Sequence, residues 1–369
     1  MAFRFDLQAV DGRARYGKIS TLHGEFETPI FMPVGTRATI KGVTSQHLRD
    51  MKAKIILGNT YHLTLRPGDE LIRDVGGLHR FMDWQQPILT DSGGFQIFSL
   101  GHSRRLTDEG AVFKSHLDGT LLELTPEKAV KIQENLGSDI AMVLDECPSA
   151  NSTDEEIQIA VNRTILWAKR SLQSQRSGTQ SLFAIVQGGM NLKYRQFCAE
   201  ELVKLDFPGY ALGGFSVGES PEQMHALLPE CASMLPELKP RYLMGVGRPI
   251  DLLEAVDAGI DMFDCVMPTR NGRNGMAFTN RGIVRLRNSM HQREMLAIQS
   301  DCSCYCCQTT SRAYIHHLLH CDEMLGGILV SLHNLHFYLE LMQECREAIR
   351  EQRFQQFRQQ CLAQWALAV

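Results

Sequence analysis

Residues 182–189 read Leu-Phe-Ala-Ile-Val-Gln-Gly-Gly, an apolar run that ends in one glutamine and two glycines. An apolar run without alternation is typical of a parallel strand that is buried on both faces. Including Leu182–Gln187, eight such runs lie along the chain, and the others are Thr28–Val34, Ala53–Gly58, Pro87–Asp91, Ile140–Asp145, Tyr210–Gly214, Arg241–Val246 and Asp261–Val266. Helical patterns separate most of them, so we expect an α/β fold, a closed (β/α)8 TIM barrel.

Helix start signals support the crossover helices between the later runs. Thr125-Pro126 and Ser220-Pro221 each place a capping hydroxyl before a proline at the first helical position. Thr153-Asp154-Glu155-Glu156 has the spacing of a capping box and predicts a helix to about Arg176. These signals favour strands that alternate with helices.

Three regions lie outside this alternation. Residues 1–27 are predicted to form antiparallel strands that cap the bottom of the barrel. Asp118-Gly119, between alternating segments in residues 100–125, predicts a hairpin. We expect one catalytic unit over 1–369, with the barrel strands in 28–266, a closing segment in 267–369 that holds a zinc-binding subdomain at about 300–350, and a short last helix over 352–367.

The composition indicates a folded chain outside the membrane. Of the 369 residues, 44% are hydrophobic, yet no apolar run is long enough to span a bilayer. The first residues lack a secretory signal, so we expect a cytoplasmic protein. The net charge is −4, but residues 266–320 hold seven arginines against two acidic residues, 7 − 2 = +5 locally. Such a patch suits phosphates, although a solvated basic face is an alternative.

Polar residues and glycines follow the ends of several predicted strands. Asp91, Asp145 and Gln187 each end a run, Asp264 lies inside the last one, and glycines accompany them at 213, 214 and 245. The strand ends of an α/β barrel converge on one mouth, where buried carboxylates are costly unless they are paired, metal-bound or functional. A single aspartate there can be a helix cap, but three together favour a pocket for a planar heterocycle such as a purine.

Four of the eleven cysteines crowd into Cys302-Ser303-Cys304-Tyr305-Cys306-Cys307. The thiolates of Cys302, Cys304 and Cys307 could form three corners of a tetrahedral Zn²⁺ site, and Cys306 is expected to point away. The candidates for the fourth ligand are His316, His317, His320, Cys321, His333 and His336. We favour His333, which we place at the start of an apolar helical stretch. Four protein ligands leave no open position, so one structural zinc per chain is expected.

Six segments together carry a family resemblance over essentially the whole chain. They are Asp91-Ser92-Gly93-Gly94-Phe95-Gln96, Val143-Leu144-Asp145-Glu146-Cys147-Pro148, Ala184-Ile185-Val186-Gln187-Gly188-Gly189, Leu212-Gly213-Gly214-Phe215-Ser216-Val217-Gly218-Glu219, Phe263-Asp264-Cys265-Val266-Met267-Pro268-Thr269-Arg270 and the cysteine cluster with its later histidine. In this order, they make the sequence resemble the bacterial tRNA-guanine transglycosylases.

The resemblance implies a mechanism by double displacement. Asp264 would be the nucleophile that attacks the ribose of a flipped-out nucleotide and expels guanine. Asp91 would protonate the leaving base and deprotonate the incoming one. The incoming base would be 7-aminomethyl-7-deazaguanine, which makes the reaction a step of queuosine biosynthesis.

The resemblance also implies how the base is held. Asp145 would accept from its N–H groups, Gln187 and the Gly214 backbone N–H would bind its carbonyl oxygen, and Phe95 and Met244 would stack on its faces. The Phe215 carbonyl and the Glu219 carboxylate would handle the aminomethyl group. Relatives usually have leucine where Phe215 stands, and those that use queuine have glycine where Val217 stands. The substrate-binding set is completed by Cys147, Gly213, Val217 and Gly245.

The implied partner is the anticodon loop of tRNAs with a G-U-N anticodon, the tRNAs for Asp, Asn, His and Tyr. Arg270 and Arg273 are suited to phosphates and neighbouring bases. The wider RNA-binding set is Gly245, Val246, Gly247, Arg248, Pro249, Ile250, Asp251, Thr269, Arg270, Asn271, Gly272 and Arg273. By resemblance, a homodimer is expected.

Three other functions remain as alternatives. A zinc-dependent hydrolase would need metal ligands at the barrel mouth, where the sequence offers no histidine pair. A non-catalytic RNA-binding subunit would have lost Asp264 or Asp91. An archaeal-type enzyme that modifies another tRNA position would carry an appended RNA-binding domain.

Overall fold

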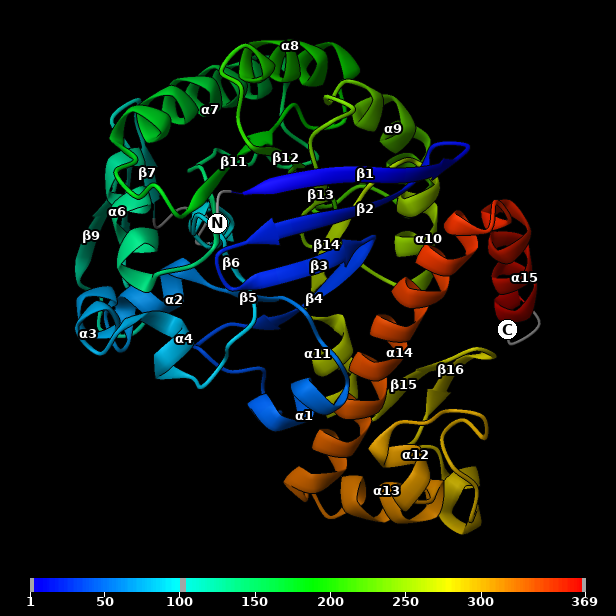
Figure 1. The fold of residues 1–369 in the computed structure, drawn as a ribbon. Coiled ribbons are helices and arrows are strands. Elements are labelled where there is room, and N and C mark those ends of the chain that lie inside the picture. The colour runs from blue at the N-terminus through cyan, green and yellow to red at the C-terminus, as the bar shows by residue number, and fades with distance from the viewer. Residues whose placement is uncertain (1–2, 100–103, 367–369) are drawn as a thin grey trace.

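The fold is a closed barrel of eight parallel strands in a computed structural model that describes residues 3–99 and 104–366 (Figure 1). The barrel strands in chain order are β4 (Ile30–Gly35), β5 (Ile56–Gly58), β6 (Ile88–Thr90), β10 (Ile140–Met142), β11 (Ser181–Val186), β12 (Gly209–Leu212), β13 (Arg241–Leu243) and β14 (Met262–Cys265). Each pairs with the next, and β14 closes on β4. All eight expected runs supply a strand, so the (β/α)8 prediction is confirmed.

The strands are shorter than the apolar runs suggested. The run expected to continue to Val246 ends as a strand at Leu243, because Gly245 has a φ of +71° and turns the chain out of the ladder. Ile140–Asp145 pairs only to Met142, although Val143 and Leu144 stay fully buried. Asp91, Asp145 and Gln187 therefore lie on the turns that follow their strands, while Asp264 lies near the end of β14.

Ten helices in the described ranges surround the barrel or line its loops. They are α1 (Ser45–Asp50), α2 (Thr60–Leu65), α3 (Asp69–Asp74), α4 (Gly77–Phe81), α5 (Gly94–Ser99), α6 (Pro126–Leu136), α7 (Asp154–Ser174), α8 (Leu192–Val203), α9 (Pro221–Ser233) and α10 (Pro249–Asp257). Thr125, Thr153 and Ser220 are N-caps, and each side chain accepts from the backbone N–H three residues on. The expected start signals are therefore confirmed.

An antiparallel sheet covers the bottom of the barrel. It consists of β1 (Arg4–Asp11), β2 (Ala14–Thr21) and β3 (Gly24–Thr28), which lie across the barrel in blue in Figure 1. Arg15 pairs with Asp261, just before β14, and His23 contacts Asp139, just before β10. Because both aspartates precede barrel strands, the sheet lies at the amino ends, as predicted for 1–27; residues 1–2 lie outside the described ranges.

The expected hairpin is part of a second antiparallel sheet. Its strands are β7 (Arg104–Leu106), β8 (Ala111–Lys114) and β9 (Leu121–Leu124). Gly119 has a φ of +76° in the turn between β8 and β9, and Asp118 accepts from the Thr120 N–H at 3.1 Å. The hairpin prediction is confirmed, while residues 100–103 of that region lie outside the described ranges.

The C-terminal part follows β14 without a break. It contains α11 (Met267–Arg273), β15 (Met276–Thr279), β16 (Gly282–Arg285), a 3-10 helix (Ser289–Arg293), α12 (Tyr305–Thr309), α13 (Arg312–His320), α14 (Met324–Arg350) and α15 (Phe354–Ala366). A small buried core of its own includes the four clustered cysteines. The long helix α14 leaves this core and packs along the barrel (Figure 1). The last helix lies where 352–367 was predicted, and residue 367 is outside the described ranges.

Within the described residues, the structure contains no helix that is both long and apolar enough to cross a membrane.

Candidate active site

Asp264 lies on β14 with one carboxylate oxygen fixed by two donors. The Tyr242 hydroxyl donates to Oδ1 at 2.6 Å and the Gly245 N–H donates to the same oxygen at 2.7 Å. Burial raises the pKa of Asp264 above its usual value, against these two hydrogen bonds. Both donors converge on Oδ1, so Oδ2 remains for other partners. A carboxylate held in this way is suited to nucleophilic attack.

Asp91 follows β6 and is held by groups from the loop after β5. Asn59 Nδ2 donates to Oδ2 at 2.5 Å, and the Thr60 N–H donates to Oδ1 at 2.8 Å. Burial, opposed by the Thr60 N–H and aided by the negative charges of Asp264 and Asp145, raises the pKa of Asp91 to about 7. A carboxyl group that titrates near neutrality can exchange protons in both directions.

Asp145 lies deeper and forms a polar cluster with residues of neighbouring strand ends. Gln187 Nε2 donates to its Oδ2 at 2.7 Å, and the Ser92 hydroxyl donates to Oδ1 at 3.2 Å. Burial raises the pKa of Asp145 to about 6. The Gln187 Oε1 atom is buried without a hydrogen-bond partner among the described residues. This cluster offers free donor and acceptor capacity to a polar ligand.

The turns around this cluster leave room for a flat ligand. A Cβ on Gly94 would lie 2.7 Å from Asp145 Oδ1, and one on Gly214 would lie 2.4 Å from Gln187 Oε1. Gly214 also has a φ of +69°, which favours glycine. The next residue after Gly94, Phe95, is 52% exposed, while Met244 is half-buried after β13. Backbone and polar atoms can thus approach a planar ring closely.

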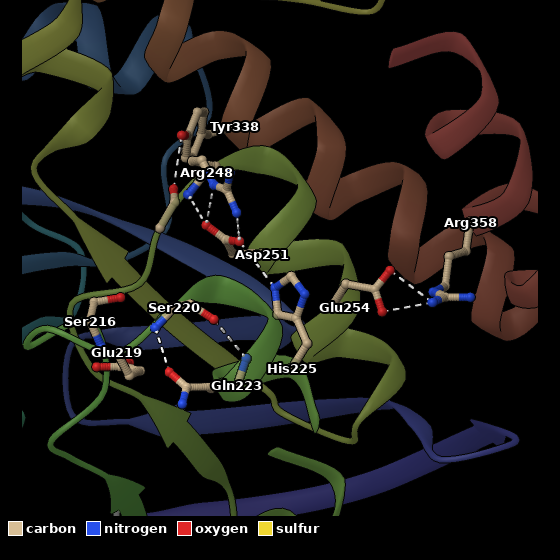
Figure 2. A network of polar contacts seen from close by, with 11 residues as sticks. Ser216, Glu219, Ser220, Gln223, His225, Arg248, Asp251, Glu254, Tyr338 and Arg358 are labelled. Carbon is tan, nitrogen blue, oxygen red and sulfur yellow. Dashed lines mark hydrogen bonds and ion pairs between the residues drawn. The ribbon is translucent and has the colours of Figure 1, made fainter. Parts of the chain in front are cut away.

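The loop after β12 is closed upon itself by Glu219. Its carboxylate accepts from the Ser216 N–H, with both residues drawn in Figure 2, and from the Val217 N–H at 3.0 Å. Phe215 is buried, with the Arg195 guanidinium carbon 4.0 Å from its ring centroid. Cys147 is also buried. In this conformation Glu219 stabilises its own loop, and a ligand amine would share the carboxylate with these N–H groups.

The loop after β13 is held by a polar network drawn in Figure 2. Asp251 accepts from Arg248 Nε at 3.0 Å and Nη2 at 2.8 Å, and it contacts His225 Nε2 at 3.0 Å. The Tyr338 hydroxyl of α14 donates to the Gly247 carbonyl at 2.9 Å. Burial opposes these bonds, but they lower the pKa of Asp251 to about 2. The network fixes the backbone that presents the Gly245 N–H to Asp264.

The expected RNA-binding residues divide by exposure. Gly245, Arg270 and Arg273 are exposed, while Arg248, Ile250 and Asn271 are half-buried. The buried members are Val246, Gly247, Pro249, Asp251, Thr269 and Gly272. A Cβ on Gly272 would lie 2.6 Å from Ser331 Oγ, so this glycine serves the packing of α11 on α14. The buried residues support the expected RNA-binding surface from below, and the exposed Arg270 and Arg273 lie on that surface.

The cysteine cluster and His333 come together as expected. The Sγ atoms of Cys302, Cys304 and Cys307 lie 3.7, 3.5 and 3.3 Å from His333 Nδ1. His333 Nε2 lies 2.7 Å from the Phe278 carbonyl, which fixes the ring and leaves Nδ1 for a metal. Cys306 Sγ instead contacts Thr310 Oγ1 at 3.4 Å. Three thiols and one imidazole within 4.8 Å of one another can hold a metal ion.

The other candidate ligands have separate partners. His316 contacts the Leu286 carbonyl, His320 the Arg287 carbonyl, His317 lies beside Cys321, and His336 lies near Ser303. One detail of the expectation was wrong: His333 is not at a helix start, because α14 already begins at Met324. The only other group in the described ranges with metal-ligand spacing is His23, His79 and Asp139, at the barrel bottom and away from the mouth.

Comparison with known proteins decides the family. A family model described as queuine tRNA-ribosyltransferase matches residues 11–367. The chain belongs to the queuine tRNA-ribosyltransferase family. A queuine tRNA-ribosyltransferase of Fusobacterium nucleatum is 50% identical, with 98% of each chain covered. Proteins of the same name from Natranaerobius thermophilus and Listeria welshimeri are each 51% identical over 96% and 99% of this chain, covering 96% and 97% of their own lengths.

Several residues of this family member's site were missed in the sequence. Tyr242 and Asn59 position the two catalytic candidates, and Ser92 supports Asp145. Arg195, fully buried on α8, holds the loops after β11 and β12. Tyr242 lies in a predicted barrel strand, but the sequence does not show that its hydroxyl reaches the neighbouring strand. Arg195 carried no signal either, since a lone arginine in a helix is usually exposed.

Proposed function

We propose that this protein is a tRNA-guanine transglycosylase that exchanges guanine at the wobble position of tRNA for 7-aminomethyl-7-deazaguanine. The observation that carries the proposal is the presence of two half-buried carboxyl groups with different surroundings at the barrel mouth. Asp264 has Oδ1 fixed by Tyr242 and Gly245, while the pKa of Asp91 is raised to about 7. One group is positioned as a nucleophile and the other is tuned to move protons.

In the first displacement, Asp264 Oδ2 attacks the anomeric carbon of the target ribose. The new carbon–oxygen bond forms as the bond from that carbon to guanine N9 breaks, and the electron pair moves to N9. Asp91, in its protonated form, supplies the proton that neutralises the departing guanine. The product is an ester between Asp264 and the ribose, with the tRNA backbone intact.

In the second displacement, the ionised Asp91 removes the N9 proton of the incoming 7-deazaguanine. N9 then attacks the anomeric carbon, the bond to Asp264 breaks, and its electron pair returns to the carboxylate. Two inversions give net retention at the ribose, as in retaining glycosidases. Asp91 ends the cycle protonated, ready for another guanine.

The base would lie against Asp145, Gln187 and the Gly213–Gly214 turn, between Phe95 and Met244. Asp145 accepts from the amino and ring N–H groups, while Gln187 and the Gly214 N–H bind the carbonyl oxygen. Gln187 gives one N–H to Asp145 and so keeps the second for the base. The branched Val217 narrows the pocket, which favours the aminomethyl base over the larger queuine, with the Phe215 carbonyl, Glu219 and Cys147 around the substituent.

The RNA substrate would be the anticodon loop of the tRNAs for Asp, Asn, His and Tyr, in the cytoplasm. Flipping a base out of a single-stranded loop costs little stacking, which suits this target. Arg270 and Arg273 of α11 directly follow the nucleophile strand and would bind phosphates, with Arg248 on the opposite loop. A homodimer would let one protomer orient the tRNA for the other.

The metal held by Cys302, Cys304, Cys307 and His333 would be one structural Zn²⁺ per chain. A Cys3His set with no open position fits zinc, which would contribute folding energy and no chemistry. We expect Cys302→Ser to lower zinc content in elemental analysis and to lower the unfolding temperature. Cys306→Ser, its matched control, should keep about one zinc per chain. Full zinc and stability in Cys302→Ser would show that the site is assigned wrongly.

The function is tested by incubating the protein with unmodified tRNA and radiolabelled guanine. We expect label to enter tRNAs with G-U-N anticodons, and unlabelled 7-aminomethyl-7-deazaguanine to compete and become permanently incorporated. Queuine at the same concentration should compete poorly. Failure to label any of these tRNAs would overturn the proposed activity, and equal competition by queuine would overturn the assigned base.

A further inference from the structure

Arg195 is a fully buried arginine whose partners are all backbone carbonyl groups. From α8, its Nε donates to the Gly189 carbonyl at 2.7 Å, and its Nη2 donates to the carbonyls of Gly213 at 3.0 Å and Gly214 at 3.4 Å. Nη1 lies 3.5 Å from the Val186 carbonyl. The guanidinium therefore joins the loop after β11 to the loop after β12.

The charge of Arg195 has no counter-ion among the described residues. The ion pairs of the structure do not include it, and the face of Phe215 covers one side of the guanidinium. Burial lowers the pKa of Arg195 from its usual value. A guanidinium keeps its charge in proteins, so we treat Arg195 as a cation. Because an apolar side chain would fill the space without this desolvation cost, packing alone does not explain the charge.

The geometry of one peptide links Arg195 to the base pocket. Arg195 binds the carbonyl of the Gly213–Gly214 peptide, which is not among the cis peptides of the structure. In a trans peptide the C=O and N–H point in opposite directions. The Gly214 N–H therefore points away from Arg195, and Gly214 lies against Gln187. No described residue accepts from this N–H in the hydrogen bonds of the structure.

We propose that Arg195 is a positioning residue that stabilises negative charge on the base through the Gly213–Gly214 peptide. This inference rests on the proposed function. When the bond to N9 breaks, the electron pair left on the base spreads over the ring to its carbonyl oxygen, which accepts from the Gly214 N–H. A cation on the carbonyl side of the same peptide polarises it and strengthens that hydrogen bond as the charge develops.

The test is how strongly the rate depends on the acidity of the base. Single-turnover incorporation is measured for 7-deazaguanines with cyano, aminomethyl, methyl or no substituent at position 7, which differ in N9–H acidity. For Arg195→Met we expect guanine exchange to lose about tenfold or more in kcat, with a smaller change in KM. The plot of log rate against base pKa should become steeper, because the least acidic bases need the cation most.

Two further variants separate charge from shape. Arg195→Lys keeps a charge but cannot bridge both loops, so its slope should lie between those of the wild type and Arg195→Met. Arg241→Met is the control, since Arg241 is half-buried and also donates to a carbonyl, that of Leu235 at 2.9 Å, at the opposite end of the barrel. It should lower stability and leave the slope unchanged.

The outcomes are distinct. An equal rate loss for all bases in Arg195→Met, with the wild-type slope, would overturn the electrostatic role. If Arg195→Met does not fold, Arg195→Gln removes the charge with a side chain that still donates a hydrogen bond, and a wild-type slope in that variant would overturn the role equally. Absence of guanine exchange by the wild-type protein would instead defeat the proposed function itself.

Discussion

Aspartates that are buried or half-buried occur at both ends of this barrel, and their partners differ. At the bottom, Asp261 accepts from the Arg15 guanidinium at 3.1 Å and Asp139 contacts His23 at 2.8 Å and His79 at 3.2 Å. At the mouth, Asp91, Asp145 and Asp264 contact only amide, hydroxyl and backbone N–H groups in the hydrogen bonds of the described residues.

The difference in partners decides what each carboxylate can do. Burial raises the pKa of Asp139, but the imidazoles of His79 and His23 and the Ile88 N–H outweigh it, and the pKa is lowered. Burial also raises the pKa of Asp261, whose charge the Arg15 guanidinium compensates. At the mouth no cation of the described residues pairs with these carboxylates, and the pKa of Asp91 rises to about 7. The bottom aspartates tie the N-terminal sheet to the barrel, while those at the mouth have the raised pKa values expected of a functional site.

The largest effect is expected from Asp264→Asn. The asparagine oxygen can still accept from Tyr242 and Gly245, so the fold should persist, but an amide is a far weaker nucleophile. We expect guanine exchange to fall on the order of 10⁴-fold or more. No covalent tRNA adduct should appear on a denaturing gel. Asp139→Asn, at the other end, is the control and should form the adduct normally; exchange by Asp264→Asn at a normal rate would remove Asp264 from the mechanism.

The next effect concerns Asp91 and pH. The incoming base needs the ionised form of Asp91, so its incorporation should rise as the pH rises through about 7 and level off above. In Asp91→Asn this dependence should vanish and kcat should fall by about 10²–10⁴-fold, with tRNA affinity retained. Single-turnover rates from pH 5.5 to 8.5 test both points. If the rate of Asp91→Asn still rose with pH near 7, the proton transfer would belong to another group.

The barrel could be predicted from sequence because its signals are local. Eight apolar runs mark the buried strands, and the hydroxyls of Thr125, Thr153 and Ser220 mark helix starts. The position of His333 in α14 was harder. In a sequence, Gly326 and Gly327 suggest that a helix begins only after them. In the structure they lie in the first turn of α14, where the missing side chains let the helix approach Leu318 and Arg273 closely, and α14 begins at Met324.

The supporting residues of the site could not be predicted because they depend on which strands and helices become neighbours. Tyr242 reaches Asp264 only because β13 and β14 are adjacent, with Tyr242 opposite Met262. Arg195 reaches the Gly213 carbonyl from a helix 18 residues earlier in the chain. The role of Glu219 in closing its own loop depends on the backbone path at Ser216, where φ is +57°. The chemistry-bearing residues were visible in sequence, and the groups that orient them were not.

The smallest effect is expected on stability. Replacing an aspartate should change the free energy of unfolding in opposite directions at the bottom and at the mouth of the barrel. The lowered pKa of Asp139 stabilises the fold above its unfolded pKa of about 3.8, and this contribution is lost as the pH falls through the folded value. The raised pKa of Asp91 acts in reverse: it stabilises the fold below about pH 3.8, and this stabilisation is lost as the pH rises through about 7. At pH 8 we therefore expect Asp139→Asn to lower the free energy of unfolding by about 1–3 kcal/mol.

Asp91→Asn should raise the free energy of unfolding at pH 8 by on the order of 2 kcal/mol, because it removes a half-buried charge that no described cation pairs with. Urea unfolding of the two variants and the wild type at pH 8 and pH 5 measures both changes. The gain in Asp91→Asn should shrink at pH 5, where wild-type Asp91 is already mostly protonated. Destabilisation by both variants at pH 8 would mean that Asp91 is a structural carboxylate like Asp139, and that the absence of a cation at the mouth does not mark reactivity.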